Sequence, residues 1–212
     1  MKLKSFHFII ISIFLLTACG GGSDGSGELK TGQFFDSPVS GLAYETSSGL
    51  SGTTGPNGEF QYRDGETVTF KLGKTVLGSA RGSSRITPFD LFFITPPLGS
   101  EFLEELGHLF DSQPANAFEH TVNMLIFLQS LDVDDNPDNG IDIPPAVANF
   151  FLLIAEAILF DQDNDEFAAA FLVLFLEIVQ QGILERNADT KPVDYRDAIK
   201  HFYKELGEDI PL

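Results

Sequence analysis

The stretch that decides the fold, residues 116–143, reads N-A-F-E-H-T-V-N-M-L-I-F-L-Q-S-L-D-V-D-D-N-P-D-N-G-I-D-I. Its apolar residues recur at spacings of three and four, as at Phe118, Val122 and Leu125, which predicts a helix with a wide apolar face. The pattern stops before the turn-forming run N-P-D-N-G at residues 136–140. A helix that is apolar on more than one side predicts the centre of a small helical domain.

Upstream of this helix the sequence alternates with a period of two, which is typical of strands. The runs E-F-Q-Y (59–62) and T-V-T-F-K-L (67–72) are separated by R-D-G-E (63–66), and this pattern predicts a β-hairpin. Residues 39–46 predict another strand. We therefore expect a small antiparallel β module of four to six strands at residues 33–90.

Downstream the spacing is helical. Helices are predicted near residues 100–109, over 145–160, over 166–184, and from an Asp194 cap to Gly207. With the helix of residues 116–131 this makes a mostly helical domain of about five helices at residues 91–212. The fold class predicted is α+β, with the β module first and the helical domain packed on it.

The first 18 residues are typical of a secretory signal, because two lysines precede an apolar run at 6–16 and small residues follow. The ending L-T-A-C at Cys19 resembles the lipobox of bacterial lipoproteins. That resemblance implies cleavage before Cys19 and its acylation, although a chance cysteine in an ordinary signal is the alternative. Residues 19–32 predict a Gly/Ser-rich tether. Gly20, at the position after the cysteine, resembles the residue found there in lipoproteins sorted to the outer membrane.

The charge of the chain excludes some partners. Removing residues 1–18 takes two of the 13 basic residues and none of the 31 acidic ones, which leaves a formal charge of −20. Such a surface repels nucleic acid and anionic headgroups, so we expect no nucleic acid partner and contact with the membrane only through the lipid anchor. Cys19 is the only cysteine, so no intramolecular disulfide is possible.

Several short runs carry a family resemblance. They are F-D-S-P-V-S-G-L-A-Y (35–44), G-E-F-Q-Y (58–62), G-E-T-V-T-F (65–70) and L-Q-S-L-D (128–132). Together they resemble a small β module, followed by a helical segment, in secreted bacterial lipoproteins and adhesin-like surface proteins. The resemblance implies an exported, surface-associated, Ig- or transthyretin-like module, and it brings no catalytic residues with it.

An acidic turn offers the first candidate site. Asp132, Asp134, Asn136 and Asp138 alternate in the manner of oxygen ligands for calcium. The run departs from an EF-hand, however, because its sixth position is Pro137 rather than Gly and its twelfth is not Glu. The alternative is a set of Asx turns and helix caps. The same two interpretations apply to the acidic run at residues 161–165.

Other chemistry finds little support in the sequence. His108, His120 and His201 lie far apart and lack metal-ligand spacing. No set of nucleophile, base and acid can be identified. The sequence therefore predicts a protein that is not an enzyme and has no cofactor, with calcium as the open exception.

The excess of apolar residues in two predicted helices is the feature with most bearing on function. Residues 147–160 are apolar on nearly all sides, and residues 167–176 have no polar face. Each run is shorter than the ~20 residues of a membrane span. Such helices form either a buried core or the wall of an apolar pocket. The residues that would line such a pocket are Phe150, Phe151, Phe160, Phe167, Phe171 and Phe175.

Three functions remain open from the sequence. The first is a non-catalytic envelope lipoprotein that acts as a binding component of a membrane or surface complex, with a membrane protein as partner. The second is an accessory carrier that passes an apolar small molecule, such as a fatty acid, hydrocarbon or lipid, to an outer-membrane transporter. The third is a calcium-stabilised surface adhesin module. An enclosed cavity beside the phenylalanines favours the carrier, and dense packing with an exposed apolar patch favours the interaction protein.

Overall fold

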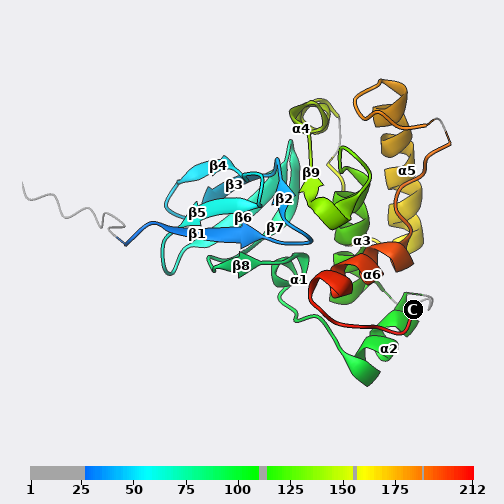
Figure 1. Ribbon diagram of the computed structural model, residues 1–212, viewed down its shortest axis with the longest axis horizontal. Helices are drawn as coiled ribbons and strands as arrows, with labels where there is room; N and C mark the ends of the chain where they lie inside the picture. The colour runs from blue at the N-terminus through cyan, green and yellow to red at the C-terminus, as the bar shows by residue number, and fades with distance from the viewer. Residues whose placement is uncertain (1–26, 110–113, 155–156, 188) are drawn as a thin grey trace, which may run out of the picture.

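The computed structural model describes residues 27–109, 114–154, 157–187 and 189–212. Its N-terminal part is rich in strands and its C-terminal part is helical, so the predicted α+β class is confirmed (Figure 1). The strands of the described residues are β1 (Lys30–Phe34), β2 (Val39–Ser40), β3 (Ala43–Thr46), β4 (Ser51–Thr53), β5 (Glu59–Tyr62), β6 (Thr67–Leu72), β7 (Thr75–Arg81), β8 (Arg85–Ile86) and β9 (Ile141–Asp142).

Two small sheets pack on each other to make the β module. One has the order β5-β1-β8 and the other β4-β3-β6-β7. Buried aromatic residues fill the space between them: the ring of Phe34 lies 4.6 Å from that of Phe70, and Phe60 lies 5.2 Å from Phe70 and 6.0 Å from Tyr44, centroid to centroid. Each sheet buries one face in this way, as the alternating sequence predicts.

The predicted hairpin between residues 59–62 and 67–72 is wrong. β5 pairs with β1, and β6 pairs with β3 and β7. Residues 63–66 do form a turn, in which the backbone N–H of Arg63 donates to the Glu66 carboxylate at 2.8 Å. This turn carries the chain from one sheet to the other. Alternation shows that two runs each have a buried face, but it does not show whether they share a sheet.

The predicted strand over residues 39–46 is broken at Gly41. This glycine has φ +87°, and a Cβ there would collide with the carbonyl oxygen of Ile143. The break frees β2 to pair in parallel with β9, which follows the acidic turn of the helical part. Parallel pairing also joins β1 to β8, so the strands are not all antiparallel. The β2–β9 pairing ties the strand-rich part directly to the segment after the central helix.

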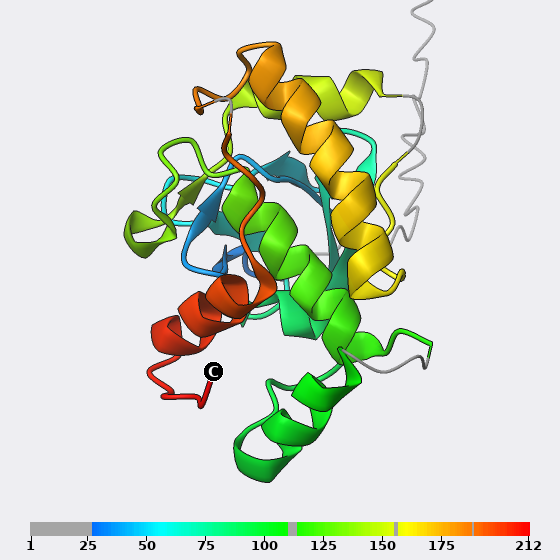
Figure 2. The same ribbon diagram turned by 90° about the vertical axis from the view of Figure 1, so that its right-hand side faces the viewer.

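The helices surround the central helix that the sequence predicts. They are α1 (Pro88–Leu91), α2 (Gly99–His108), α3 (Ala117–Ser130), α4 (Pro145–Leu153), α5 (Asn164–Gln180) and α6 (Tyr195–Glu205), with a 3-10 turn η1 (Pro137–Asn139). α3 is buried along almost its whole length and contacts α1, α5 and α6. Figure 2 shows it between α5 and α6. No helix among the described residues is long and apolar enough to cross a membrane.

The helix predicted over residues 145–160 ends early, as α4, at Leu153. The turn between β6 and β7 provides the physical reason. The backbone N–H of Lys74 donates to the Phe151 carbonyl at 3.1 Å, and its ammonium group donates to the Ile154 carbonyl at 3.3 Å. These bonds satisfy carbonyls at the end of the helix, so the helix can stop without leaving them unpaired.

A buried polar contact holds the turn after β1 against the helices. Asp36 is fully buried, and the side-chain amide of Gln129 on α3 donates to its carboxylate at 3.0 Å and to the Ala198 carbonyl on α6 at 3.1 Å. Burial raises the pKa of Asp36 well above its usual range. This one contact links the β module, α3 and α6.

Candidate functional site

The six phenylalanines predicted to line a pocket pack against one another. All are buried, with no more than 7% of any side chain exposed. The ring of Phe127 on α3 lies 5.3 Å from each of Phe151, Phe160 and Phe171. Phe167 lies 5.6 Å from Phe171, in a stacked arrangement. The rings therefore fill the space between α3, α4 and α5 with aromatic contacts.

A hollow beside this aromatic cluster lies at the surface. It has a volume of about 540 Å³ and runs between α5 and the chain that precedes it. Phe167 and Phe171 are the phenylalanines in its wall. Most of its lining consists of smaller apolar residues, namely Ile154, Ala157, Ile158, Leu159, Ala170 and Leu174. The site is a surface groove over a packed core.

Exposed apolar side chains lie in the groove wall or next to it along the chain: Leu159 is in the wall, and Leu153 and Val173 directly precede the wall residues Ile154 and Leu174. Leu153 is 84% exposed, Val173 65% and Leu159 58%. These three residues, together with the groove, are called the α4–α5 face below. A gathering of exposed apolar side chains over a well-packed core is typical of a surface that contacts another molecule. The acidic residues nearest to it along the chain include Asp161, Asp165, Glu166 and Glu177, all exposed.

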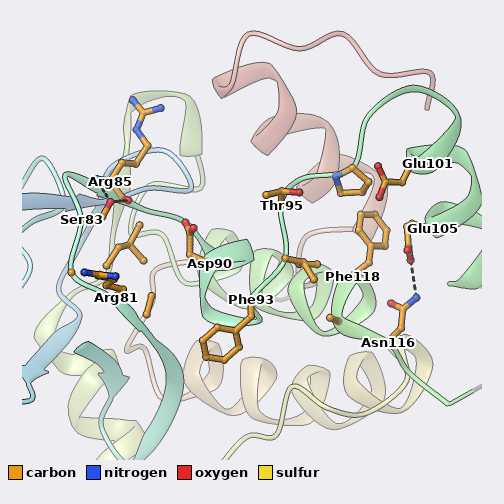
Figure 3. A pocket seen from close by; sticks show the side chains of 16 residues that line it. Arg81, Ser83, Arg85, Asp90, Phe93, Thr95, Glu101, Glu105, Asn116 and Phe118 are labelled. Carbon is orange, nitrogen blue, oxygen red and sulfur yellow. Dashed lines mark hydrogen bonds between the residues drawn. The ribbon is translucent and has the colours of Figure 1, made fainter. Parts of the chain in front are cut away.

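A second groove lies where the β module meets α1, α2 and the start of α3 (Figure 3). It has a volume of about 860 Å³. Phe93 lies at its wall, 85% exposed, with φ +60°. A left-handed backbone is uncommon for a bulky residue and costs about 1–3 kcal/mol. The backbone thus holds a large apolar side chain in solvent at this groove, which we call the Phe93 groove.

Charges of opposite sign line the two ends of the Phe93 groove. Figure 3 shows Arg81 and Arg85 at one end and Glu101 and Glu105 at the other. The Arg85 guanidinium lies 4.2 Å from the centre of the Phe35 ring, and Glu105 accepts a hydrogen bond of 2.7 Å from the side-chain amide of Asn116. No His or Cys is among the lining residues. The arrangement suits recognition of a polar segment with charges of both signs.

The residues of the acidic turn that were predicted to bind calcium do not all come together in the structure. Asp132 is 1% exposed, and its carboxylate accepts backbone N–H bonds from Asn136 at 2.8 Å and Asp142 at 2.9 Å. Asp134 accepts from the side-chain amide of Asn139 at 2.8 Å. Asp138 points away from this pair, toward α6. The structure thus brings Asp132 and Asp134 together and directs Asp138 elsewhere.

The pKa values of Asp132, Asp134 and Asp138 are shifted in different directions. Burial raises the pKa of Asp132 to about 6. The hydrogen bond from Asn139 lowers the pKa of Asp134, and the bond from Lys204, at 2.6 Å, lowers the pKa of Asp138. Among the second acidic run, Asp163 caps α5 by accepting the N–H of Glu166 at 2.9 Å.

One group of residues that the structure brings together was not predicted from the sequence. Asp138 of η1 lies beside His201 and Glu205 of α6, and the three could together hold a metal ion. His201 and Glu205 are four positions apart on one helix, so their shared face could have been found from the sequence. Asp138 could not, because it lies 63 residues from His201. The other two histidines of the helical part, His108 and His120, are in α2 and α3 and do not join this group.

Comparisons with known proteins give a partial similarity to a lipoprotein. The chain is 45% identical over 58 residues to the "Putative lipoprotein AcfD homolog" of Escherichia coli (strain K12). The similarity covers 26% of this chain and 4% of that protein. No protein-family model matches the chain, and no solved structure matches it. The partial similarity indicates a lipoprotein. Cys19 itself lies outside the described residues, as do the predicted signal and most of the tether.

Proposed function

We propose that this protein is a lipid-anchored lipoprotein of the cell envelope, held in the outer membrane through Cys19, and that it binds a protein partner through the α4–α5 face. The observation that carries the proposal is the set of exposed apolar side chains beside a filled aromatic core. Leu153, Leu159 and Val173 expose more than half of their surface. The partial similarity to a lipoprotein supports the anchor.

The packing of the phenylalanines favours this function over a carrier of apolar ligands. A carrier encloses most of its ligand in a cavity lined by apolar side chains. Here the rings that would line such a cavity contact one another, with Phe127 within 5.3 Å of three of them. The hollow beside them lies at the surface, and Leu159 in its wall is exposed. A groove of this kind suits the side chains of a partner protein.

The charge around the face favours a basic partner segment. Glu177 lines the groove, Asp161 and Glu166 directly precede its wall residues Gln162 and Phe167 in the chain, all three are exposed, and the mature chain has a formal charge of −20. A second copy of the chain would bring acidic borders together, and an anionic membrane surface would be repelled in the same way. An amphipathic helix with an apolar stripe and flanking Lys or Arg residues matches both the groove and its border.

A model peptide tests the proposal. The probe is a helical peptide of about 18 residues, with leucines on one face and lysines on the other. We expect micromolar binding to the chain from Gly20 onward, measured by fluorescence anisotropy. The double variant Leu153→Ser/Val173→Ser should weaken binding at least about tenfold, because both side chains are exposed anchors rather than core residues.

Matched controls separate the proposed face from other apolar sites. Leu98→Ser removes an apolar residue that is 48% exposed elsewhere, and Phe93→Ser alters the Phe93 groove; both should keep the wild-type affinity. A peptide of the same composition in scrambled order, and one with Glu in place of Lys, should bind weakly. Equal binding to the double variant would refute the proposal. So would tighter binding to anionic vesicles or to a fluorescent fatty acid than to the peptide.

A further inference from the structure

Three potential metal ligands meet where the acidic turn contacts the last helix. They are a carboxylate oxygen of Asp138, a ring nitrogen of His201 and a carboxylate oxygen of Glu205, and these atoms all lie within 4.8 Å of one another. The residues come from two segments, η1 and α6, that are far apart in the sequence. The α6 residues are one helical turn apart, so their side chains share a face of the helix.

The contacts of His201 match those of a metal-binding histidine. Its Nδ1 atom lies 3.1 Å from the Asp138 carboxylate, and its Nε2 atom lies 3.2 Å from the hydroxyl oxygen of Ser37. A histidine that ligates a metal through one nitrogen usually forms a hydrogen bond through the other, which fixes the ring and its tautomer. Here Ser37 can accept the Nε2–H bond, and it is itself buried. The lone pair of Nδ1 then faces Asp138.

The spacing and accessibility of the group also fit an ion. Two ligand atoms at about 2.0–2.1 Å from a tetrahedral zinc ion are roughly 3.3 Å apart, close to the 3.1 Å between Nδ1 and the Asp138 oxygen. The His201 side chain is 6% exposed and that of Asp138 54%. His201 is therefore a buried ligand held in place by its surroundings, and Asp138 provides a carboxylate at the surface, where an ion can enter.

We propose that Asp138, His201 and Glu205 bind a divalent ion of the zinc class. Water would complete its coordination, as in sites that offer three protein ligands. The imidazole nitrogen favours zinc over calcium, which prefers oxygen ligands alone. Lys204 can stay on the second oxygen of Asp138, where it now donates at 2.6 Å. A bound ion would link the acidic turn to α6 and so stabilise the contact between them.

Titration of the metal-free chain with Zn²⁺ tests this site. The experiment uses the chain from Gly20 onward, which contains every described residue and lacks Cys19, after removal of any affinity tag. We expect one ion to bind with micromolar affinity by calorimetry, and the melting temperature to rise with Zn²⁺ and fall back with a chelator. Co²⁺ should give the visible absorption of a site with a nitrogen ligand.

Variants separate this site from adventitious binding. Glu205→Gln changes a partly exposed residue and should weaken Zn²⁺ binding at least about tenfold, as should His201→Gln if that variant folds. Lys204→Gln should tighten binding by roughly fivefold, because it removes a positive charge beside the ion. His108→Gln and His120→Gln should have no effect.

Three results would overturn the proposal. One is the absence of Zn²⁺ binding at micromolar concentrations. Another is binding that Glu205→Gln and Lys204→Gln leave unchanged. The last is binding of Ca²⁺ that is tighter than that of Zn²⁺ and is lost on Asp134→Asn but kept on Glu205→Gln, which would assign the ion to the acidic turn instead.

Discussion

Replacing Phe127 with alanine tests whether the aromatic cluster is a packed core. Phe127 is fully buried on α3, and three other rings lie 5.3 Å from it. Removing a buried phenylalanine ring costs about 3–5 kcal/mol through lost burial and the cavity that remains. Each aromatic pair adds about 0.5–1.5 kcal/mol beyond the buried area. We therefore expect Phe127→Ala to lower the free energy of unfolding by about 4–5 kcal/mol, near the upper end of the range.

The assay is urea unfolding followed by far-UV circular dichroism, because the chain has no tryptophan. The midpoint should fall while the slope of free energy against urea stays constant, which shows that stability alone has changed. Val173→Ala provides the control on α5. Its side chain is 65% exposed, so its effect should stay within about 0.5 kcal/mol.

A small effect would refute this reasoning. If Phe127→Ala cost less than about 1 kcal/mol, the ring would not be closely packed, and a hollow suited to an apolar ligand would become the better account. A double-mutant cycle with Phe171→Ala adds an independent check. The two rings should couple by about 0.5–1.5 kcal/mol, and additive effects would show that they do not touch.

Three further predictions follow from single contacts. Burial raises the pKa of Asp36, so the folded protein holds a proton that the unfolded chain releases, and stability should fall as pH rises through the folded-state pKa. Asp36→Asn should remove this fall in stability and be more stable than wild type at neutral pH, because its side-chain amide can donate to the unpaired Oε1 of Gln129. Urea midpoints compared across pH measure both effects. Gly73→Ala should cost about 1–3 kcal/mol, because φ is +58° and a Cβ would collide with the Phe151 backbone; thermal melting measures this loss. Asp163→Ala should remove the α5 cap and cost about 1 kcal/mol in the same assay.

Local patterns predicted several of the individual elements. The helix of residues 116–131 appears as α3, and Asn116 caps it through a 3.0 Å bond from the N–H of Glu119. Asp194 caps α6 as expected, and Gly207, with φ +79°, follows its end. These features depend on neighbours along the chain, which is why periodicity and capping residues could reveal them.

The structural features that were not predicted depend on contacts between residues distant in the sequence. The break at Gly41 depends on the Ile143 carbonyl, and the end of α4 depends on the turn at Lys74. The chain crosses from one sheet to the other at residues 63–66 because β5 pairs with β1, which precedes this turn by about 30 residues. Alternation and helical spacing carry no information on such pairings. The same holds for Asp138, which joins His201 only when the acidic turn folds back on α6.

The apolar helix α5 shows how a size pattern could have separated core from surface. The sequence F-A-A-A-F-L-V-L-F-L has no polar face, so hydrophobicity alone could not say which side is buried. Its phenylalanines, however, recur every fourth position, at Phe167, Phe171 and Phe175, and all three are buried. The smaller residues between them, such as Ala169 and Val173, are exposed. A core selects large rings that fill space, whereas a face of small apolar residues lets another helix approach closely. The outer side of α5 therefore has the composition of a helix-packing surface that the described residues leave exposed, and this agrees with the partner helix proposed for the α4–α5 face.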